Sequence, residues 1–118
     1  MMTNSTSWTA VCSADDLVAN SGVCALIEDQ QIALFKVSLN GVEQLFAISN
    51  WDPIGLANVL YRGILCSVAD KTVVASPLYK QRFCLLSGQC IDDASQKVQV
   101  YPVRLEGQNV FIQLPCGQ

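Results

Sequence analysis

Apolar residues recur along the chain in short runs separated by turn-forming residues, which is typical of many short strands. The clearest unit is "QIALFKVSLNGVEQLFAIS", in which two β-favouring runs meet at Asn40-Gly41. This dipeptide tolerates the positive φ angles of a tight hairpin. The second run, "EQLFAIS", has apolar residues at consecutive positions. We therefore predict a hairpin whose second strand is at least partly covered on both faces.

The end of the chain shows a second hairpin pattern. "KVQVYPVRL" and "NVFIQL" flank the turn "EGQ", and the alternation of Val110, Ile112 and Leu114 marks one buried face. Pro102 interrupts the first of these runs. Because proline cannot donate to a strand ladder, this strand is an edge, begins at Pro102 or bulges there.

The remaining segments predict further short strands and very little helix. "SWTAVC" and "GVCALI" predict strands, and Ser13, three residues before Asp16, predicts a capping box at one short helical turn between them. "ILCSVADKTVVAS" predicts two strands about a turn, and "WDPIGLANVLYRG" predicts a long loop with a helical turn at "LANVL". Since the sequence shows no repeat or linker, we expect residues 1–118 to form a single all-β domain, an antiparallel β-sandwich or partial barrel with short helical turns in its loops.

Composition narrows the function classes. The apolar content of 51% and charged content of 14% argue against disorder. A net charge of −3 gives no general attraction to phosphate backbones, so we expect no nucleic-acid partner. The N-terminus has neither the basic start nor the apolar run of a secretory signal, and no segment approaches the roughly 18 apolar residues of a membrane helix. We expect a cytoplasmic chain that does not bind a membrane.

The cysteines and the lack of histidine limit the possible chemistry. A cytosolic setting keeps thiols reduced, so we expect free and mostly buried thiols, with Cys116 exposed. Histidine is absent from the whole chain, which removes Ser-His and Cys-His nucleophiles and the commonest metal ligand. Since no Cys-x-x-Cys occurs, we expect no metal site. The cysteines are Cys12, Cys24, Cys66, Cys84, Cys90 and Cys116.

Other candidate catalytic groups are weak. Ser76 precedes Lys80 by four residues across a proline, whereas the Ser-x-x-Lys motif needs three on a helix. Adjacent loop carboxylates seldom converge on one substrate atom, and no glycine-rich nucleotide motif is present. We therefore predict no catalytic residue in this chain. The adjacent carboxylates are Asp15-Asp16 and Asp92-Asp93.

Two segments carry a resemblance to a known family. "FAISNWDPIG" and the later "VVASPLYKQRFCLLSG" resemble the ligand segments of Rieske ferredoxins, where one strand ends in Cys-Pro-His and another in Cys-Pro-x-His-Gly before a Phe-containing strand. Aligning the prolines and Phe83 places the ligand positions at Asp52, Ile54, Ser76 and Tyr79. A Rieske cluster needs two thiolates and two imidazoles. The resemblance thus implies a Rieske-like fold with vestigial ligand positions, and no cofactor in this chain.

A narrower resemblance follows from "DPIGLANVLYRG", "SPLYKQRF" and "VYPVRLEG", which are similar to the small subunits of cytoplasmic NAD(P)H-dependent nitrite reductases. It extends from about Trp8 to Leu114, although Cys84 stands where that family more often has an acidic residue. The resemblance implies an accessory subunit without catalytic residues of its own. Its implied partner is the large subunit, which carries FAD, an iron–sulfur cluster and sirohaem and reduces nitrite to ammonium.

In a Rieske domain the two ligand segments form an exposed tip. Aromatic and arginine side chains are enriched at interface hot spots, so we predict that the tip docks on the large subunit. The alternatives are that these are ordinary solvated loop residues, or that the chain is a free-standing, cluster-less interaction module with another redox partner. The predicted interface residues are Trp51, Arg62, Tyr79, Lys80, Gln81 and Arg82.

Overall fold

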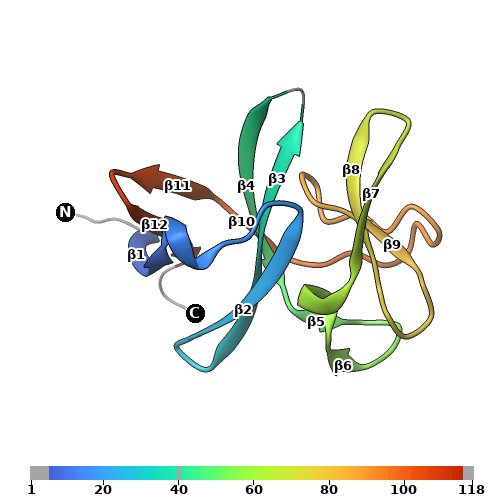
Figure 1. Cartoon of the computed structure of the whole chain (residues 1–118). Helices are drawn as coiled ribbons and strands as arrows, with labels where there is room; N and C mark the ends of the chain where they lie inside the picture. The colour runs from blue at the N-terminus through green and yellow to red at the C-terminus, as the bar shows by residue number, and fades with distance from the viewer. Residues whose placement is uncertain (1–5, 40, 116–118) are drawn as a thin grey trace.

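Antiparallel strands arranged in three sheets and one short ribbon form the fold (Figure 1). The computed structural model describes residues 6–39 and 41–115. From left to right in Figure 1 lie the sheet that contains β1, a central sheet, and the sheet formed by β7, β8 and β9. The predicted all-β architecture is confirmed, with short helical turns in its loops.

The central sheet contains the predicted hairpin. Its strands pair in the order β10-β4-β3-β2. The β3–β4 ladder runs to the pair Leu39↔Val42, and Gly41 has a φ of +80°, as the predicted tight turn requires. Asn40 lies outside the described residues. The strands are β2 (Ser21–Ile27), β3 (Gln30–Leu39), β4 (Val42–Ser49) and β10 (Val100–Tyr101).

This hairpin separates two hydrophobic cores. Phe35 and Ile48 belong to a core shared with Phe83, which we call the β8-side core. Leu34 and Ala47 belong to a second core on the other face, which we call the β12-side core. Consecutive residues therefore point into different cores, as expected for a strand with both faces covered. The prediction of two covered faces is confirmed.

The β1 sheet pairs its strands in the order β1-β12-β11. Val110, Ile112 and Leu114 are buried, which confirms the predicted apolar face of the last strand. Pro102 lies between β10 and β11, where the chain leaves the central sheet, and its carbonyl accepts the Gln113 N–H at 3.0 Å. Proline thus marks the change of sheet. The strands are β1 (Thr6–Ser13), β11 (Val103–Glu106) and β12 (Asn109–Pro115).

The third sheet pairs β7-β8-β9, and the ribbon pairs β5 with β6. Ala69 and Asp70 form the turn between β7 and β8, both with positive φ. The strands are β5 (Trp51–Asp52), β6 (Ala57–Asn58), β7 (Ile64–Val68), β8 (Lys71–Ala75) and β9 (Arg82–Cys84).

Two short 3₁₀ turns are the helical elements of the described part. The first, Ala14–Asp16, has the predicted capping box, in which the Asp16 carboxylate accepts the Ser13 N–H at 2.9 Å. The predicted helical turn at "LANVL" is wrong, because β6 occupies part of it and the second 3₁₀ turn is Leu60–Arg62. The Leu60 N–H donates to the Asn50 carbonyl, which fixes the start of the turn at this later position. No helix in residues 6–39 and 41–115 is long and apolar enough to cross a membrane.

The five described cysteines are free thiols, but the expectation that most are buried is wrong. Cys84 and Cys90 are buried, whereas Cys24 and Cys66 are exposed. Both exposed residues belong to strands at the edge of a sheet, where one side has no neighbouring strand to cover it. Cys116 lies outside the described residues.

Candidate functional site

The two segments that resemble Rieske ligand loops lie against each other. We call residues 51–58 and 76–82 the tip loops. The Ser76 hydroxyl donates a hydrogen bond of 2.5 Å to the Asp52 Oδ2 atom. Asp52 is 0% exposed and Ser76 is 1% exposed. The structure thus brings together the two positions that align with the cluster cysteines.

Each of these side chains also binds the backbone of its own loop. Asp52 Oδ1 accepts the Ile54 N–H at 2.8 Å and the Gly55 N–H at 3.0 Å, which is the side-chain turn favoured by aspartate before proline. Ser76 Oγ accepts the Leu78 N–H at 3.3 Å. One buried carboxylate and one buried hydroxyl therefore hold both loops. Burying such groups is tolerated because they are hydrogen-bonded.

Gly55 allows the loops to approach closely. A Cβ atom added at Gly55 would lie 2.5 Å from Leu78 Cδ1 and 2.9 Å from Asp52 Oδ2. Since real Cβ contacts are longer than this, any larger residue would push Leu78 or the Asp52 carboxylate away. Glycine thus allows Leu78 and the Asp52 carboxylate to keep their positions between the loops.

The positions that align with the cluster histidines have different environments. Ile54 is half-buried and packs on the β8-side core. Tyr79 is 65% exposed. Neither side chain can ligate iron as an imidazole does.

The residues at the ligand positions do not fit a Rieske cluster. They offer a carboxylate and a hydroxyl bonded to each other, an alkyl group and a phenol, and the sequence has no histidine. Within residues 6–39 and 41–115, no group of three His, Cys, Asp or Glu side chains is placed to hold a metal ion. A cluster held by two thiolates and two imidazoles cannot be built from this donor set.

Asn50 anchors the first tip loop to the central sheet. Its side chain is fully buried, with Nδ2 donating to Gln31 Oε1 at 3.2 Å and Oδ1 accepting the Tyr61 N–H at 2.8 Å. This amide therefore joins β3 to the 3₁₀ turn after the loop. Asn50 was not predicted as a site residue from the sequence, although a polar residue directly after a buried apolar strand is a usable signal.

Arg82, one of the predicted interface residues, is engaged within the chain. Its Nη2 lies 2.7 Å from Asp92 Oδ1, and its Nε donates to Asp92 Oδ2 at 3.1 Å. Hydrogen bonds from the Arg82 side chain and backbone lower the pKa of Asp92, and the same pairing raises the pKa of Arg82. The Arg82 guanidinium is therefore committed to a bidentate ion pair that orders the loop before β10.

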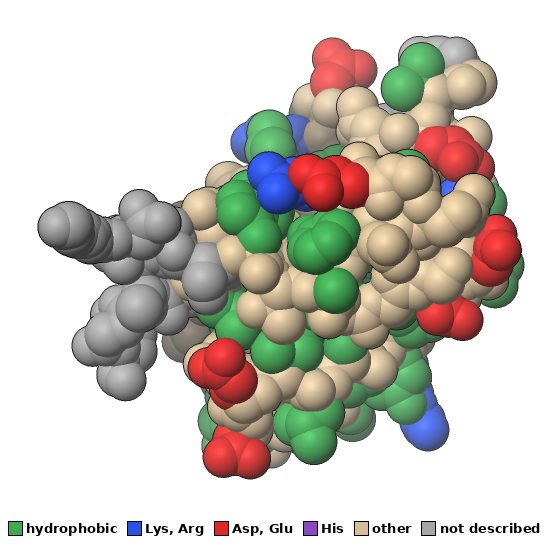
Figure 2. All heavy atoms as spheres, turned by 90° about the vertical axis from the view of Figure 1, so that its left-hand side faces the viewer, with side chains coloured by type: hydrophobic (Ala, Val, Ile, Leu, Met, Phe, Trp, Pro, Cys, Tyr) green, Lys and Arg blue, Asp and Glu red, His purple; other side chains and the backbone are tan. Residues whose placement is uncertain are grey.

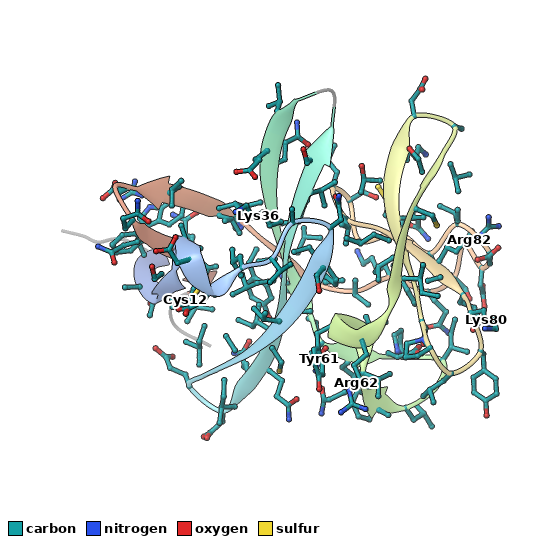
Figure 3. The ribbon with its side chains drawn as sticks, viewed as in Figure 1. Cys12, Lys36, Tyr61, Arg62, Lys80 and Arg82 are labelled. Atoms are coloured by element: carbon teal, nitrogen blue, oxygen red, sulfur yellow. The ribbon has the colours of Figure 1, made fainter. Side chains whose placement is uncertain are left out.

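Arg62 and Lys80 are the exposed cations of the tip. Arg62 Nε donates to the Tyr61 hydroxyl at 2.8 Å. Figure 3 shows Arg62 beside Tyr61 and Lys80 at the outer edge of the second loop. Neither cation has a carboxylate partner within the described part of the chain. The buried Gln81 Oε1 has no hydrogen-bond partner among the described residues.

Lys80 occupies the position of the glycine in the Rieske motif. Its φ is +64°, and Leu56 in the other loop has a φ of +59°. The left-handed region costs a non-glycine residue about 1–2 kcal/mol. Strained residues of this kind concentrate at functional sites.

Large apolar side chains are exposed on both tip loops. Trp51 and Tyr79 were predicted from the sequence, whereas Leu56 and Leu78 were not, because their exposure depends on the loop geometry. The exposed fractions are 43% for Trp51, 67% for Leu56, 45% for Leu78 and 65% for Tyr79.

A groove of about 570 Å³ between β1 and β2 is a separate concave surface. Cys12 and Cys24 are among the residues that line it. Burial raises the pKa of both thiols, and the charge of Asp16 raises that of Cys12 further. Since the thiolate is the nucleophile, these cysteines are poor catalytic candidates.

Fold and tip together define a Rieske-like domain. The chain matches the Rieske-like [2Fe-2S] domain family over residues 7–113 and belongs to that family. It is 41% identical over 99 residues to the nitrite reductase (NADH) small subunit of Escherichia coli (strain K12), covering 84% of this chain and 90% of that protein. The predicted resemblance to nitrite reductase small subunits is therefore confirmed.

Two further comparisons extend this result. The NMR structure of the E. coli protein NirD superposes with a TM-score of 0.83 at 38% identity, covering 96% of this chain and 99% of that one. The chain is also 37% identical over 105 residues to a Klebsiella oxytoca protein named nitrite reductase [NAD(P)H] large subunit. That match covers 89% of this chain and 11% of the Klebsiella protein. A counterpart of most of this chain is thus a segment of a much longer protein.

Proposed function

We propose that this chain is the cluster-free small subunit of a cytoplasmic NAD(P)H-dependent nitrite reductase and that its tip docks on the large subunit. The large subunit would carry the flavin, the iron–sulfur cluster and the sirohaem and reduce nitrite to ammonium. This chain would bind and support it without a cofactor of its own. Its ligand positions lack the thiolates and imidazoles that a Rieske cluster needs.

The exposed apolar group on the tip loops is the observation that carries this proposal. Trp51, Leu56, Leu78 and Tyr79 are large side chains held in water by loops that are themselves fixed by buried hydrogen bonds. Large apolar side chains exposed together on two adjoining loops are typical of interaction sites. Rigid loops also lose less entropy on binding than mobile ones.

The Klebsiella protein supports the choice of partner. A segment similar to this chain forms part of a protein named as the large subunit. Two units that share one polypeptide have a high effective concentration and are free to contact each other. The same contact between separate chains requires a surface with its own affinity, which the tip offers.

Charge on the tip indicates the chemistry of the partner surface. Arg62 and Lys80 are exposed beside the apolar side chains, whereas the chain as a whole has a net charge of −3. The matching surface on the large subunit should be apolar at its centre, with carboxylates around it. Binding should weaken as salt is raised, because rim charges are screened.

The test is the affinity of tip variants for the purified large subunit. Trp51→Ala and Tyr79→Ala should each weaken binding by roughly 30-fold, since a hot-spot side chain contributes about 2 kcal/mol or more. Leu26→Ala on β2 and Leu105→Ala on β11 are matched controls, with exposed fractions of 70% and 51%. Unchanged affinity in both folded tip variants, or equal losses in the controls, would reject docking through the tip.

A further inference from the structure

We propose that the Asp52–Ser76 hydrogen bond is a latch that replaces the metal cross-link of a Rieske site and holds the tip loops closed. Its effect on binding rests on the proposed docking function. The latch itself rests on contacts within this chain.

The ligand positions explain why a substitute for the metal is needed. In a Rieske site the two loops are joined because both supply ligands to one cluster. Here the two cysteine positions carry Asp52 and Ser76, and the Ser76 hydroxyl donates directly to the Asp52 carboxylate at 2.5 Å. The loops are therefore joined at the same two positions by a hydrogen bond.

The latch is connected to the backbone on both sides. Asp52 accepts the Ile54 and Gly55 N–H groups, and Ser76 accepts the Leu78 N–H. In the second loop, the Lys80 N–H also donates to the Ser76 carbonyl at 3.0 Å. Breaking the link between the two side chains leaves the buried Asp52 Oδ2 without its donor, which destabilises the closed arrangement of both loops.

Backbone strain gives the loops a reason to open. Leu56 and Lys80 both have positive φ without being glycine, one in each loop. Such conformations persist only where surrounding contacts enforce them. Each of these residues follows a latch residue by four positions and donates its N–H to that residue's carbonyl, Leu56 to Asp52 at 2.7 Å and Lys80 to Ser76 at 3.0 Å. Releasing the latch should let both loops relax and move Leu56, Leu78 and Tyr79 from their exposed positions.

The direct experiment is amide hydrogen exchange, resolved by NMR, on Ser76→Ala in the full chain. Exchange at Ile54, Gly55 and Lys80 should accelerate by about tenfold, because the closed state loses a buried hydrogen bond, while exchange in β3 and β4 stays unchanged. Ser95→Ala is the matched control. It removes a Ser–Asp hydrogen bond of 2.6 Å to Asp93, but that bond lies within one exposed loop.

A second variant covers the case in which Ser76→Ala does not fold. Ser76→Cys keeps the side-chain shape and a weak S–H donor. Exchange at the same amides should therefore accelerate, but by less than in Ser76→Ala. Unchanged exchange at these amides in a folded Ser76 variant overturns the latch. So does an acceleration spread equally over β3 and β4, because that is the result of a general loss of stability.

Affinity for the large subunit separates the latch from the docking proposal. Ser76→Ala should bind about tenfold more weakly and Ser95→Ala as well as the unmodified chain. If Tyr79→Ala weakens binding while Ser76→Ala does not, the proposed role of the latch in docking is wrong. If neither weakens binding but exchange is accelerated, docking through the tip is wrong and the latch stands.

Discussion

The tip loops and the β1 sheet are built in different ways. In the β1 sheet, main-chain pairing runs along β1 and β12 from Thr6↔Pro115 to Ser13↔Asn109. The surface at that end of the molecule is a mixture of apolar, acidic, basic and other side chains (Figure 2). In the tip loops main-chain pairing is limited to the short β5–β6 ribbon and a few turn hydrogen bonds, and the loops depend also on the side chains of Asn50, Asp52 and Ser76.

This difference indicates where substitutions should have the larger effect on stability. A strand ladder shares its stability among many similar hydrogen bonds, so surface changes usually alter it by less than about 0.5 kcal/mol. A loop held by a few buried polar side chains loses a large part of its support with each of them. The β1 sheet should therefore tolerate surface substitutions better than the tip loops tolerate changes in their buried polar side chains.

The largest effect should come from the core beneath the tip. Phe83→Ala removes a fully buried ring from the β8-side core and should lower the free energy of unfolding by about 3–5 kcal/mol. Phe111→Ala on β12 should cost less, since this ring is only half-buried, with the Arg104 guanidinium 5.9 Å from its centroid. Denaturant unfolding measures the loss of unfolding free energy in each variant. Equal losses would contradict the expected difference between the two regions.

A smaller effect is expected at Asn50. Asn50→Ala leaves the Tyr61 N–H without its acceptor and should lower the free energy of unfolding by about 1–3 kcal/mol. Asn109→Ala, at an exposed position beginning β12, should change it by less than about 0.5 kcal/mol. If Asn50→Ala lowers the free energy of unfolding no more than Asn109→Ala does, the tip loops and the β1 sheet do not differ in the way described.

Lys80 should show stability and binding moving in opposite directions. Lys80→Gly relieves a left-handed φ and should raise the free energy of unfolding by up to about 1 kcal/mol, while it weakens affinity for the large subunit. Lys97→Gly, at an exposed position without positive φ, should bring no gain in stability. Thermal unfolding and binding of both variants check this prediction. A loss of stability in Lys80→Gly would show that the backbone there is not strained.

The smallest effect should be in the titration of Asp92. Because Arg82 lowers the pKa of Asp92, the pair adds stability above the ordinary carboxyl pKa, and this is lost as pH falls through the lowered value. NMR titration of Arg82→Ala should raise the pKa of Asp92 toward its ordinary value, because the side-chain hydrogen bonds are lost while the backbone N–H of residue 82 still donates to Asp92 Oδ2. Asp93, whose pKa is lowered by Ser95, should titrate as before. An unchanged Asp92 in this variant would show that Arg82 is not its partner.

Local pattern was sufficient to predict the regular parts of the molecule. The β3–β4 hairpin and the alternation in β12 depend on neighbouring residues, so their strands could be read from sequence. The position of the turn after β6 could not be predicted from the sequence, because it is fixed by Asn50, which precedes the turn by about ten residues. Propensity alone gives no information about such a contact.

The tip was predictable in part. Resemblance to Rieske ligand segments identified Asp52 and Ser76 as equivalent positions, but their direct hydrogen bond joins residues from different loops and follows only from the fold. The same holds for Arg82, which was predicted as an interface residue and is paired with Asp92 across two loops. Exposure of Leu56 and Leu78 depends on loop conformation, so composition could not reveal it.

The central claim is that the tip loops are the surface that meets the large subunit. Amide hydrogen exchange of this chain, measured free and in complex with the purified large subunit, tests it most directly. The account predicts slower exchange in residues 51–62 and 76–82 on binding, with β11 and β12 unchanged. Protection confined to β11 and β12, with the tip loops exchanging as in the free chain, would contradict it.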